Sequence, residues 1–151
     1  MHFPIVSVKS CTITSGIECL MHQSKVSQLS REHLSLVRVE HVADMGFCVL
    51  SESRFSEGDL ILRLVGDEVP MSNRYSVFVA EENLHIDPTN ECRFLNHSCR
   101  PNARFSGRDL FALHPIEKGE QICFDYRETE LHLHEPFYCK CENDCCGGRI
   151  A

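Results

Sequence analysis

Three cysteines near the end of the sequence have a spacing that suits metal binding. Cys139, Cys141 and Cys146 form the pattern Cys-x-Cys-x4-Cys, and thiolates at this spacing can converge on one tetrahedral zinc ion. The fourth ligand is either Cys145 or a distant residue. Because adjacent cysteines seldom chelate the same ion, a distant thiol is preferred, and Cys99 is the best-placed candidate. We expect one zinc ion at these four residues; a tail that holds no metal is the alternative.

A polar run in the middle of the chain is the second group with the residue types for chemistry. The run from Arg93 to Asn102 fits neither strand alternation nor a helix face, so it predicts a loop held by its own hydrogen bonds. A nucleophilic cysteine–histidine pair is disfavoured, because His97 and Cys99 are two residues apart on a loop and no third group orients them. Ser98 lacks the Gly-x-Ser-x-Gly turn of a nucleophilic serine.

The composition restricts the class of protein. The 151 residues are 42% hydrophobic and 25% charged, with 8 glycines and 6 prolines, which is typical of one globular domain. Fifteen Lys and Arg against twenty-two Asp and Glu give a net charge of −7. A nucleic acid is therefore not an expected direct partner, whereas a basic, lysine-containing protein or peptide is. The composition does not indicate an oligomeric state.

Ten cysteines are unusually many for this length. The N-terminus lacks the pattern of a secretory signal, and the longest apolar stretch, residues 60–65, is too short to cross a membrane. We therefore expect an intracellular, reducing setting, cytoplasmic or nuclear, in which cysteines bind metal or pack rather than form disulfides. The cysteines expected to act as small buried residues are Cys11, Cys19, Cys48, Cys92 and Cys123.

Short apolar runs separated by turn residues must position these groups, and they predict a mainly β fold with little helix. The run over 60–65 is expected to end at Gly66-Asp67. A hairpin turn is expected at 81–83, and the runs over 103–105 and 110–113 are expected to flank another turn at 106–107. Within residues 1–35, a loose helical spacing suggests one helix. The strands are expected over 37–39, 47–50, 60–65, 77–79, 84–86, 103–105, 110–113 and 122–124.

The polar run resembles the core signature of the SET-domain protein-lysine methyltransferases. Gly119-Glu120-Gln121-Ile122-Cys123-Phe124-Asp125-Tyr126 resembles the second signature of that family, and 139–146 resembles its post-SET zinc motif. The spacing of Gly46, Gly58 and Asp87 agrees as well. The resemblance implies the SET fold, in which small sheets of short strands surround a pseudoknot. It also implies an N-terminal extension over 1–35, a SET domain over 36–128 and a post-SET tail over 129–151, with no pre-SET segment.

The resemblance implies transfer of a methyl group from S-adenosylmethionine to a lysine amine of a histone or another basic protein. In the family, the cofactor and the lysine enter from opposite faces and meet in a narrow channel. An in-line displacement of this kind needs a neutral amine and accurate positioning. It needs no metal at the reacting atom, so the expected zinc ion is structural.

The same resemblance assigns roles to individual residues. Tyr126 is the expected catalytic residue, and Phe124 occupies the position that limits the number of methyl groups added. Because Phe124 and Phe105 are both phenylalanines where the family can carry tyrosine, we expect di- or trimethylation. The other site residues are Gly46, Phe47, Asn96, His97 and one or both of Phe137 and Tyr138 for the cofactor, and Tyr75 and Phe105 for the lysine channel.

One position departs from the family pattern. The usual Gly-x-Gly of the cofactor turn is Gly46-Phe47-Cys48, so either the cofactor is bound less tightly or the backbone at Cys48 needs no positive φ. The competing hypothesis is a catalytically weak SET-like module that binds a lysine-containing partner without turnover. Cys48 supports that module, whereas the intact Asn96-His97 pair and the sequence from Phe124 to Tyr126 support the enzyme.

Overall fold

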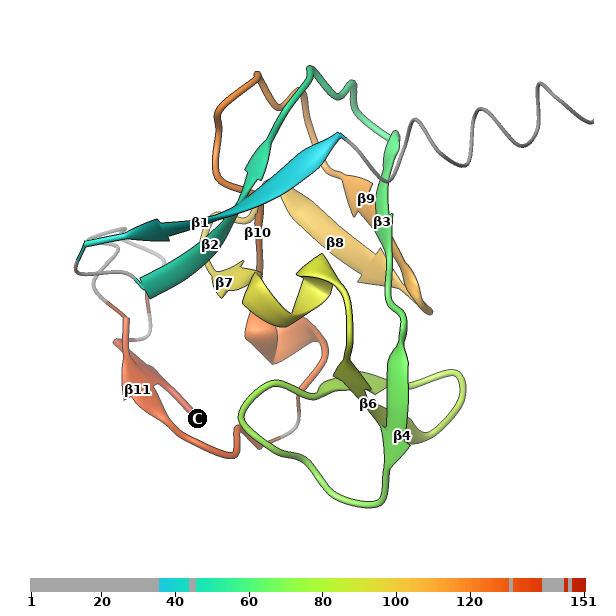
Figure 1. Ribbon diagram of the computed structural model, residues 1–151. Coiled ribbons are helices and arrows are strands. Elements are labelled where there is room, and N and C mark those ends of the chain that lie inside the picture. Colours follow the sequence, from blue (N-terminus) through green and yellow to red (C-terminus); the bar gives the residue numbers. More distant parts are fainter. Residues whose placement is uncertain (1–35, 44–45, 131, 140–145, 147) are drawn as a thin grey trace, which may run out of the picture. The chain divides into compact units, whose positions relative to one another are not determined.

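Short strands dominate the computed structural model, which describes residues 36–43, 46–130, 132–139, 146 and 148–151. In this part of the chain the strands form three two-stranded sheets and two three-stranded sheets (Figure 1). The strands are β1 Val37–Val42, β2 Gly46–Ser51, β3 Leu60–Arg63, β4 Gly66–Val69, β5 Val77–Val79, β6 Leu84–Pro88, β7 Asn96–His97, β8 Ala103–Ser106, β9 Asp109–Ala112, β10 Cys123–Phe124, β11 Phe137–Tyr138 and β12 Arg149–Ile150.

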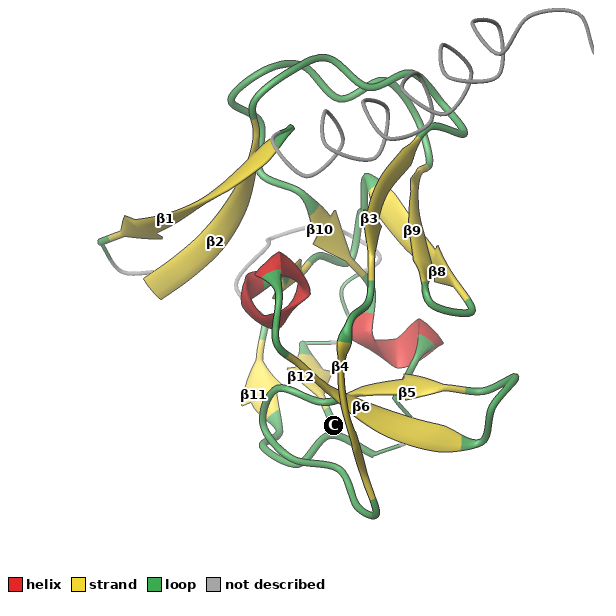
Figure 2. Cartoon of the chain, turned by 45° about the vertical axis from the view of Figure 1, so that its right-hand side comes forward, coloured by secondary structure: helices red, strands yellow, loops and turns green. Residues whose placement is uncertain are grey.

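Two 3-10 helices accompany the strands: η1 spans Glu91–Phe94 and η2 spans Tyr126–Glu128. η1 contacts β1 and β2 on one side and β6 on the other, so it lies between the β1–β2 hairpin and the β4–β6–β5 sheet (Figure 2). Among the described residues, no helix has the length and apolar character of a membrane span. The helix expected within residues 1–35 lies outside the described residues.

The predicted hairpins are confirmed. β5 pairs with β6, and β8 pairs with β9, both antiparallel. The turns between them contain Asn83 with φ of 53° and Gly107 with φ of 57°, a left-handed backbone that these two residue types tolerate better than most. Turn chemistry thus set these registers locally.

The strand expected over 60–65 does end before Gly66, since β3 stops at Arg63, but the expectation that Gly66-Asp67 forms the break was wrong. Gly66 begins β4, which pairs with β6 so that Gly66 faces Pro88. A Cβ atom at Gly66 would lie 2.1 Å from the carbonyl oxygen of Asp87, and Gly66 has no positive φ. The glycine therefore allows two strands to approach closely rather than making a turn.

The polar run is also more regular than the expected loop. It contains the end of η1 and the short strand β7, which pairs in parallel with β10 so that Asn96 faces Cys123 and His97 faces Phe124. No local pattern predicts this strand, because its partner lies about 27 residues further along the chain. The pairing joins the two signatures, as the SET fold requires.

The second signature is held on its other side by β2. The N–H of Gly119 donates to the carbonyl of Ser51 at 2.8 Å, and the N–H of Ile122 donates to the carbonyl of Val49 at 2.9 Å. The Asn102 side chain adds a clamp from the first signature: its amide donates to the Gln121 carbonyl at 2.8 Å and accepts from the N–H of Cys123 at 2.9 Å. The signature segment is therefore fixed between β2 and β7.

The core lies beneath these sheets and gathers buried apolar side chains from most of the strands. Burial of each large side chain contributes roughly 1.5–3 kcal/mol relative to exposure. Of the cysteines expected to be buried, Cys48 and Cys92 are buried, Cys123 is half-buried, and Cys11 and Cys19 lie outside the described residues. The largest fully buried side chains are Ile61, Leu64, Ile86, Leu110, Ile116, Ile122 and Ile150.

Candidate functional site

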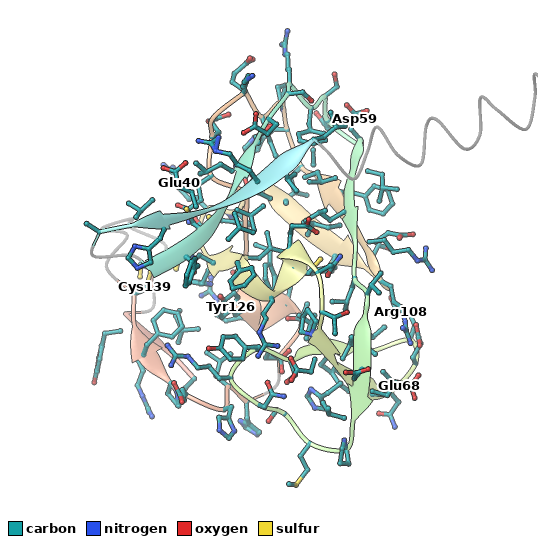
Figure 3. The ribbon with its side chains drawn as sticks, in the orientation of Figure 1. Glu40, Asp59, Glu68, Arg108, Tyr126 and Cys139 are labelled. Carbon is teal, nitrogen blue, oxygen red and sulfur yellow. The ribbon has the colours of Figure 1, made fainter. Side chains whose placement is uncertain are left out.

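A cavity of about 690 Å³ opens where the two signatures, β2 and the C-terminal segment meet. This volume is within the usual range of small-molecule sites. Its wall includes most of the site residues expected from the sequence; Phe105 and Tyr138 are not part of it. Figure 3 shows Tyr126 toward the centre of the molecule and Cys139 toward its edge. The predicted residues that line the cavity are Gly46, Phe47, Tyr75, Asn96, His97, Phe124, Tyr126 and Phe137.

Tyr126 is fixed by contacts to both signatures. η2 begins at Tyr126 because the Asp125 side chain accepts a hydrogen bond from the N–H of Arg127 at 3.0 Å and caps the helix. The Tyr126 hydroxyl donates to the carbonyl of Leu95 at 2.7 Å. Burial, with a smaller contribution from Cys123, raises the pKa of Tyr126 above its usual range. The hydroxyl is therefore protonated at neutral pH and acts as a hydrogen-bond donor.

Aromatic rings surround Tyr126. The ring centroid of Phe124 lies 4.9 Å from that of Tyr126, and the Phe137 centroid lies 6.2 Å away in an edge-on arrangement. Phe105 packs edge-on against Phe124 at 5.1 Å. Because Phe124 lines the cavity and Phe105 does not, Phe105 supports the cavity wall from behind.

The cofactor turn expected at the start of β2 has the backbone that its sequence requires. Gly46 has φ of 78°, whereas Cys48 is fully buried and does not have positive φ. The second glycine of the family pattern is thus not needed for backbone conformation here. The Asn96 side chain donates to the carbonyl of Phe47 at 3.0 Å, which ties this turn to β7.

His97 connects Tyr126 to a sulfur atom. The backbone N–H of Tyr126 donates to Nδ1 of His97 at 3.3 Å, and Nε2 lies 3.1 Å from the sulfur of Cys99. Burial lowers the pKa of His97, and Arg127 lowers it further against the opposing effect of Asp125, so the imidazole is neutral at pH 7. Because Nδ1 accepts, Nε2 carries the proton and donates to Cys99. The expectation that two residues so placed on a loop would not face each other was wrong: β7 ends at His97, yet Nε2 of His97 lies 3.1 Å from the sulfur of Cys99.

Cys99 and Cys139 are brought together although 40 residues separate them. Their sulfur atoms lie 3.8 Å apart. Two sulfurs that bind one tetrahedral zinc ion at about 2.3 Å are separated by about 3.8 Å, so the donor pair fits that metal. Among the described residues, the His97, Cys99 and Cys139 ligand atoms lie within 4.8 Å of one another. Cys146 is not in this group, and Cys141 lies outside the described residues.

Several cavity residues were not anticipated from the sequence. The Arg93 guanidinium lies 3.9 Å from the centre of the Tyr75 ring and pairs with Asp87, which in turn accepts from Asn73 at 3.0 Å. These contacts hold Tyr75 in the cavity wall. Glu130, four residues after Tyr126, also lines the cavity. No local sequence pattern marks Glu130 as a site residue, because only contacts in the folded chain make it part of the wall.

Comparisons with known proteins agree with this architecture. The SET domain family model matches residues 46–127, more than half of the chain. Histone-lysine N-methyltransferase ash1 of Drosophila melanogaster is 30% identical over 132 residues, which cover 72% of this chain and 6% of ash1. The putative histone-lysine N-methyltransferase ASHH4 of Arabidopsis thaliana is 22% identical over 134 residues, which cover 72% of this chain and 38% of ASHH4. The chain thus spans well under half the length of these two relatives.

Solved structures have the same fold. KRYPTONITE in complex with mCHG DNA and SAH matches with a TM-score of 0.62 and 24% identity, covering 75% of this chain and 28% of KRYPTONITE. Its complex with mCHH DNA, an H3(1-15) peptide and SAH matches with a TM-score of 0.62 and 23% identity, covering 76% and 29%. The parallel pairing of β7 with β10, the family match over both signatures and the shared fold lead to one conclusion: the chain belongs to the SET domain family.

Proposed function

We propose that the chain is an S-adenosylmethionine-dependent protein-lysine N-methyltransferase. The observation that carries the proposal is the Tyr126 hydroxyl, protonated and held at 2.7 Å by the Leu95 carbonyl, in a cavity that also contains the Gly46 turn and Asn96. The names of ash1 and ASHH4 as histone-lysine methyltransferases support the reaction class.

The cofactor half of the cavity is assigned to Gly46, Phe47, Asn96, His97 and Phe137. The side chain of Asn96 is engaged with the Phe47 carbonyl, and the His97 ring is engaged on both nitrogens, so both residues would bind the cofactor through their backbone groups. Phe137 is the preferred adenine cover, because Tyr138 is 75% exposed and does not line the cavity. When bound, the cofactor supplies an electrophilic methyl group.

The residues of this chain would contribute to the reaction by positioning the lysine amine. The Tyr126 hydroxyl and the Leu95 carbonyl orient the neutral lysine amine for a straight approach. Phe124 and Tyr126, with Tyr75 across the cavity, enclose the alkyl chain and exclude water. With Phe124 in place of tyrosine, no hydroxyl at that position holds a water or restrains the amine, which leaves room for di- or trimethylation.

A structural zinc ion is assigned to Cys99, Cys139, Cys141 and Cys146. The 3.8 Å separation of the Cys99 and Cys139 sulfurs supports this pair, and Cys141 and Cys146 stay predictions from their spacing. The N–H of His97 would then stabilise the Cys99 thiolate from outside the coordination sphere. The ion would anchor a post-SET tail over 129–151 against a SET domain over 36–128, and thiolate ligands favour an intracellular, reducing setting.

The substrate is proposed to be a lysine of a basic protein, with histones as the first class to test. The net charge of −7 favours such a partner, and KRYPTONITE was solved with an H3 peptide. The competing hypothesis of a binding module rests on Cys48. Because Cys48 is buried in β2 with an ordinary backbone, that residue does not favour the module.

The experiment is transfer of a labelled methyl group from S-adenosylmethionine to mixed histones and lysine peptides. We expect transfer by the unaltered chain and a loss of about 100-fold or more in Tyr126→Phe, with cofactor affinity retained by calorimetry. Tyr138→Phe, which removes an exposed hydroxyl outside the cavity, is the matched control and should keep full activity. Cofactor binding without transfer to any protein mixture would favour the module instead.

A further inference from the structure

The charged residues of the cavity wall differ in whether a permanent charge of opposite sign lies beside them. Arg93 pairs with Asp87, and Arg74 lies 3.6 Å from Glu135. Glu130 differs from them. Among the described residues, its nearest group that can carry a positive charge is His85, whose Nδ1 lies 3.8 Å from Oε2 of Glu130. An imidazole is cationic only when protonated, so Glu130 is the acidic group of the wall without a permanent cationic partner.

Glu130 is placed close to the catalytic segment. Its backbone N–H donates to the carbonyl of Tyr126 at 2.8 Å, so it lies one helical turn beyond Tyr126. One carboxylate oxygen accepts from the N–H of Phe78 at 2.7 Å. The Glu130 side chain is only 7% exposed, and Glu130 lines the cavity.

The second carboxylate oxygen has no hydrogen bond within the described part of the chain. The 3.8 Å separation from His85 Nδ1 is too long for one, and Nδ1 is itself buried without a partner. Burial raises the pKa of Glu130, and the Phe78 N–H and His85 compensate only in part. A buried carboxylate in this situation is costly unless a cation reaches it.

We propose that Glu130 is a specificity-determining residue whose carboxylate receives the ammonium group of the target lysine as it enters the cavity. The inference rests on the proposed function and names the charged group that selects lysine over neutral side chains of the same length. Val77, Leu133 and Phe124 line the same cavity and suit the alkyl chain, and the carboxylate supplies the charge. Before transfer the ammonium group releases one proton to solvent water, and the lone pair of the resulting neutral amine is then free to attack the methyl group.

The test is a double-mutant cycle whose main readout is peptide binding. The probe is the lysine peptide that the unaltered chain methylates best, compared with the same peptide carrying norleucine at the target position. Both are titrated in the presence of S-adenosylhomocysteine into the full chain and into Glu130→Gln. Glutamine has nearly the same shape and keeps an oxygen for the Phe78 N–H, so the fold should be preserved.

We expect the unaltered chain to bind the lysine peptide about tenfold tighter than the norleucine peptide, and Glu130→Gln to lose most of that difference. KM for the lysine peptide should rise in Glu130→Gln, while S-adenosylhomocysteine affinity stays unchanged. Glu135→Gln is the matched control: Glu135 also lines the cavity, but it is 59% exposed and pairs with Arg74. The control should keep the tenfold discrimination.

Two outcomes would overturn the inference. If Glu130→Gln weakens both peptides equally, the discrimination survives and Glu130 is only a structural support. If Glu130→Gln leaves both affinities unchanged, Glu130 does not contact the target side chain. Absence of methyl transfer by the unaltered chain would instead refute the proposed function, so the two failures are distinguishable.

Discussion

The Tyr126 hydroxyl donates to the Leu95 carbonyl at 2.7 Å, and this bond joins the two signatures at the cavity. Leu95 is the residue that ends η1, and its N–H donates back to the Cys92 carbonyl at 3.3 Å. The position of the hydroxyl therefore depends on where the first signature ends its helical turn. The backbone N–H of Tyr126 donates to His97, which belongs to the first signature, as Leu95 does. The first signature therefore orients Tyr126 both at its hydroxyl and at its backbone.

Phe124→Tyr should shift the methylation products toward the monomethyl state. Phe124 lines the cavity, and its ring centroid is 4.9 Å from that of Tyr126, so an added hydroxyl can hold a water or the amine. Mass spectrometry of a lysine peptide measures the product distribution. Phe105→Tyr is the control, because that ring lies behind Phe124 and outside the cavity wall. An active Phe124→Tyr variant with unchanged products would contradict the assignment.

Metal analysis should find about one zinc ion per chain. Cys139→Ser should lower this value and expose the segment after η2 to proteolysis, whereas Cys123→Ser should leave the zinc content unchanged. Cys123 makes a poor ligand because burial raises its pKa to about 12. A full zinc content in the double variant Cys99→Ser, Cys146→Ser would refute the ligand set.

Glu130 should make the free energy of unfolding depend on pH. Its pKa is raised above the ordinary 4.5 by burial, so the folded state binds its proton more tightly than the unfolded state does. The resulting stabilisation is complete below pH 4.5 and is lost as the pH rises through the folded pKa. Urea unfolding should therefore show that the unaltered chain loses free energy of unfolding relative to Glu130→Gln as the pH rises above 4.5. A pH-independent difference would contradict the burial of a titrating carboxyl.

Gly66→Ala should destabilise the fold by about 2–3 kcal/mol. The new Cβ would meet the Asp87 backbone oxygen at 2.1 Å, and strand β6 cannot move away without breaking its pairing with β4 and β5. Gly107→Ala is the comparison, because its surroundings are open and only its φ of 57° is unfavourable, a cost of about 1 kcal/mol. Urea denaturation measures both. Equal losses would mean that β4 and β6 are less closely packed.

Local patterns in the sequence were sufficient for much of the fold. Alternation and turn residues predicted the β5–β6 and β8–β9 hairpins, because a hairpin is decided by neighbours in the chain. They were not sufficient at Gly66, where a residue that usually marks a turn instead permits close contact with Asp87. The need for glycine at this position comes from contact with a distant strand, which local sequence patterns do not indicate.

The zinc cysteines were expected from their type and spacing, and the cofactor and lysine residues were expected from the resemblance to the SET family. The sequence by itself thus determined which side chains are candidates for these roles. Only the tertiary structure decided which of them meet. Pairing of β7 with β10 placed Tyr126 against Leu95. Other contacts between distant segments brought Cys99 to Cys139 and packed Phe105 against Phe124. The same packing put Glu130 into the cavity wall. Contacts between segments far apart in the chain depend on burial and strand pairing across the whole fold, which no local spacing specifies.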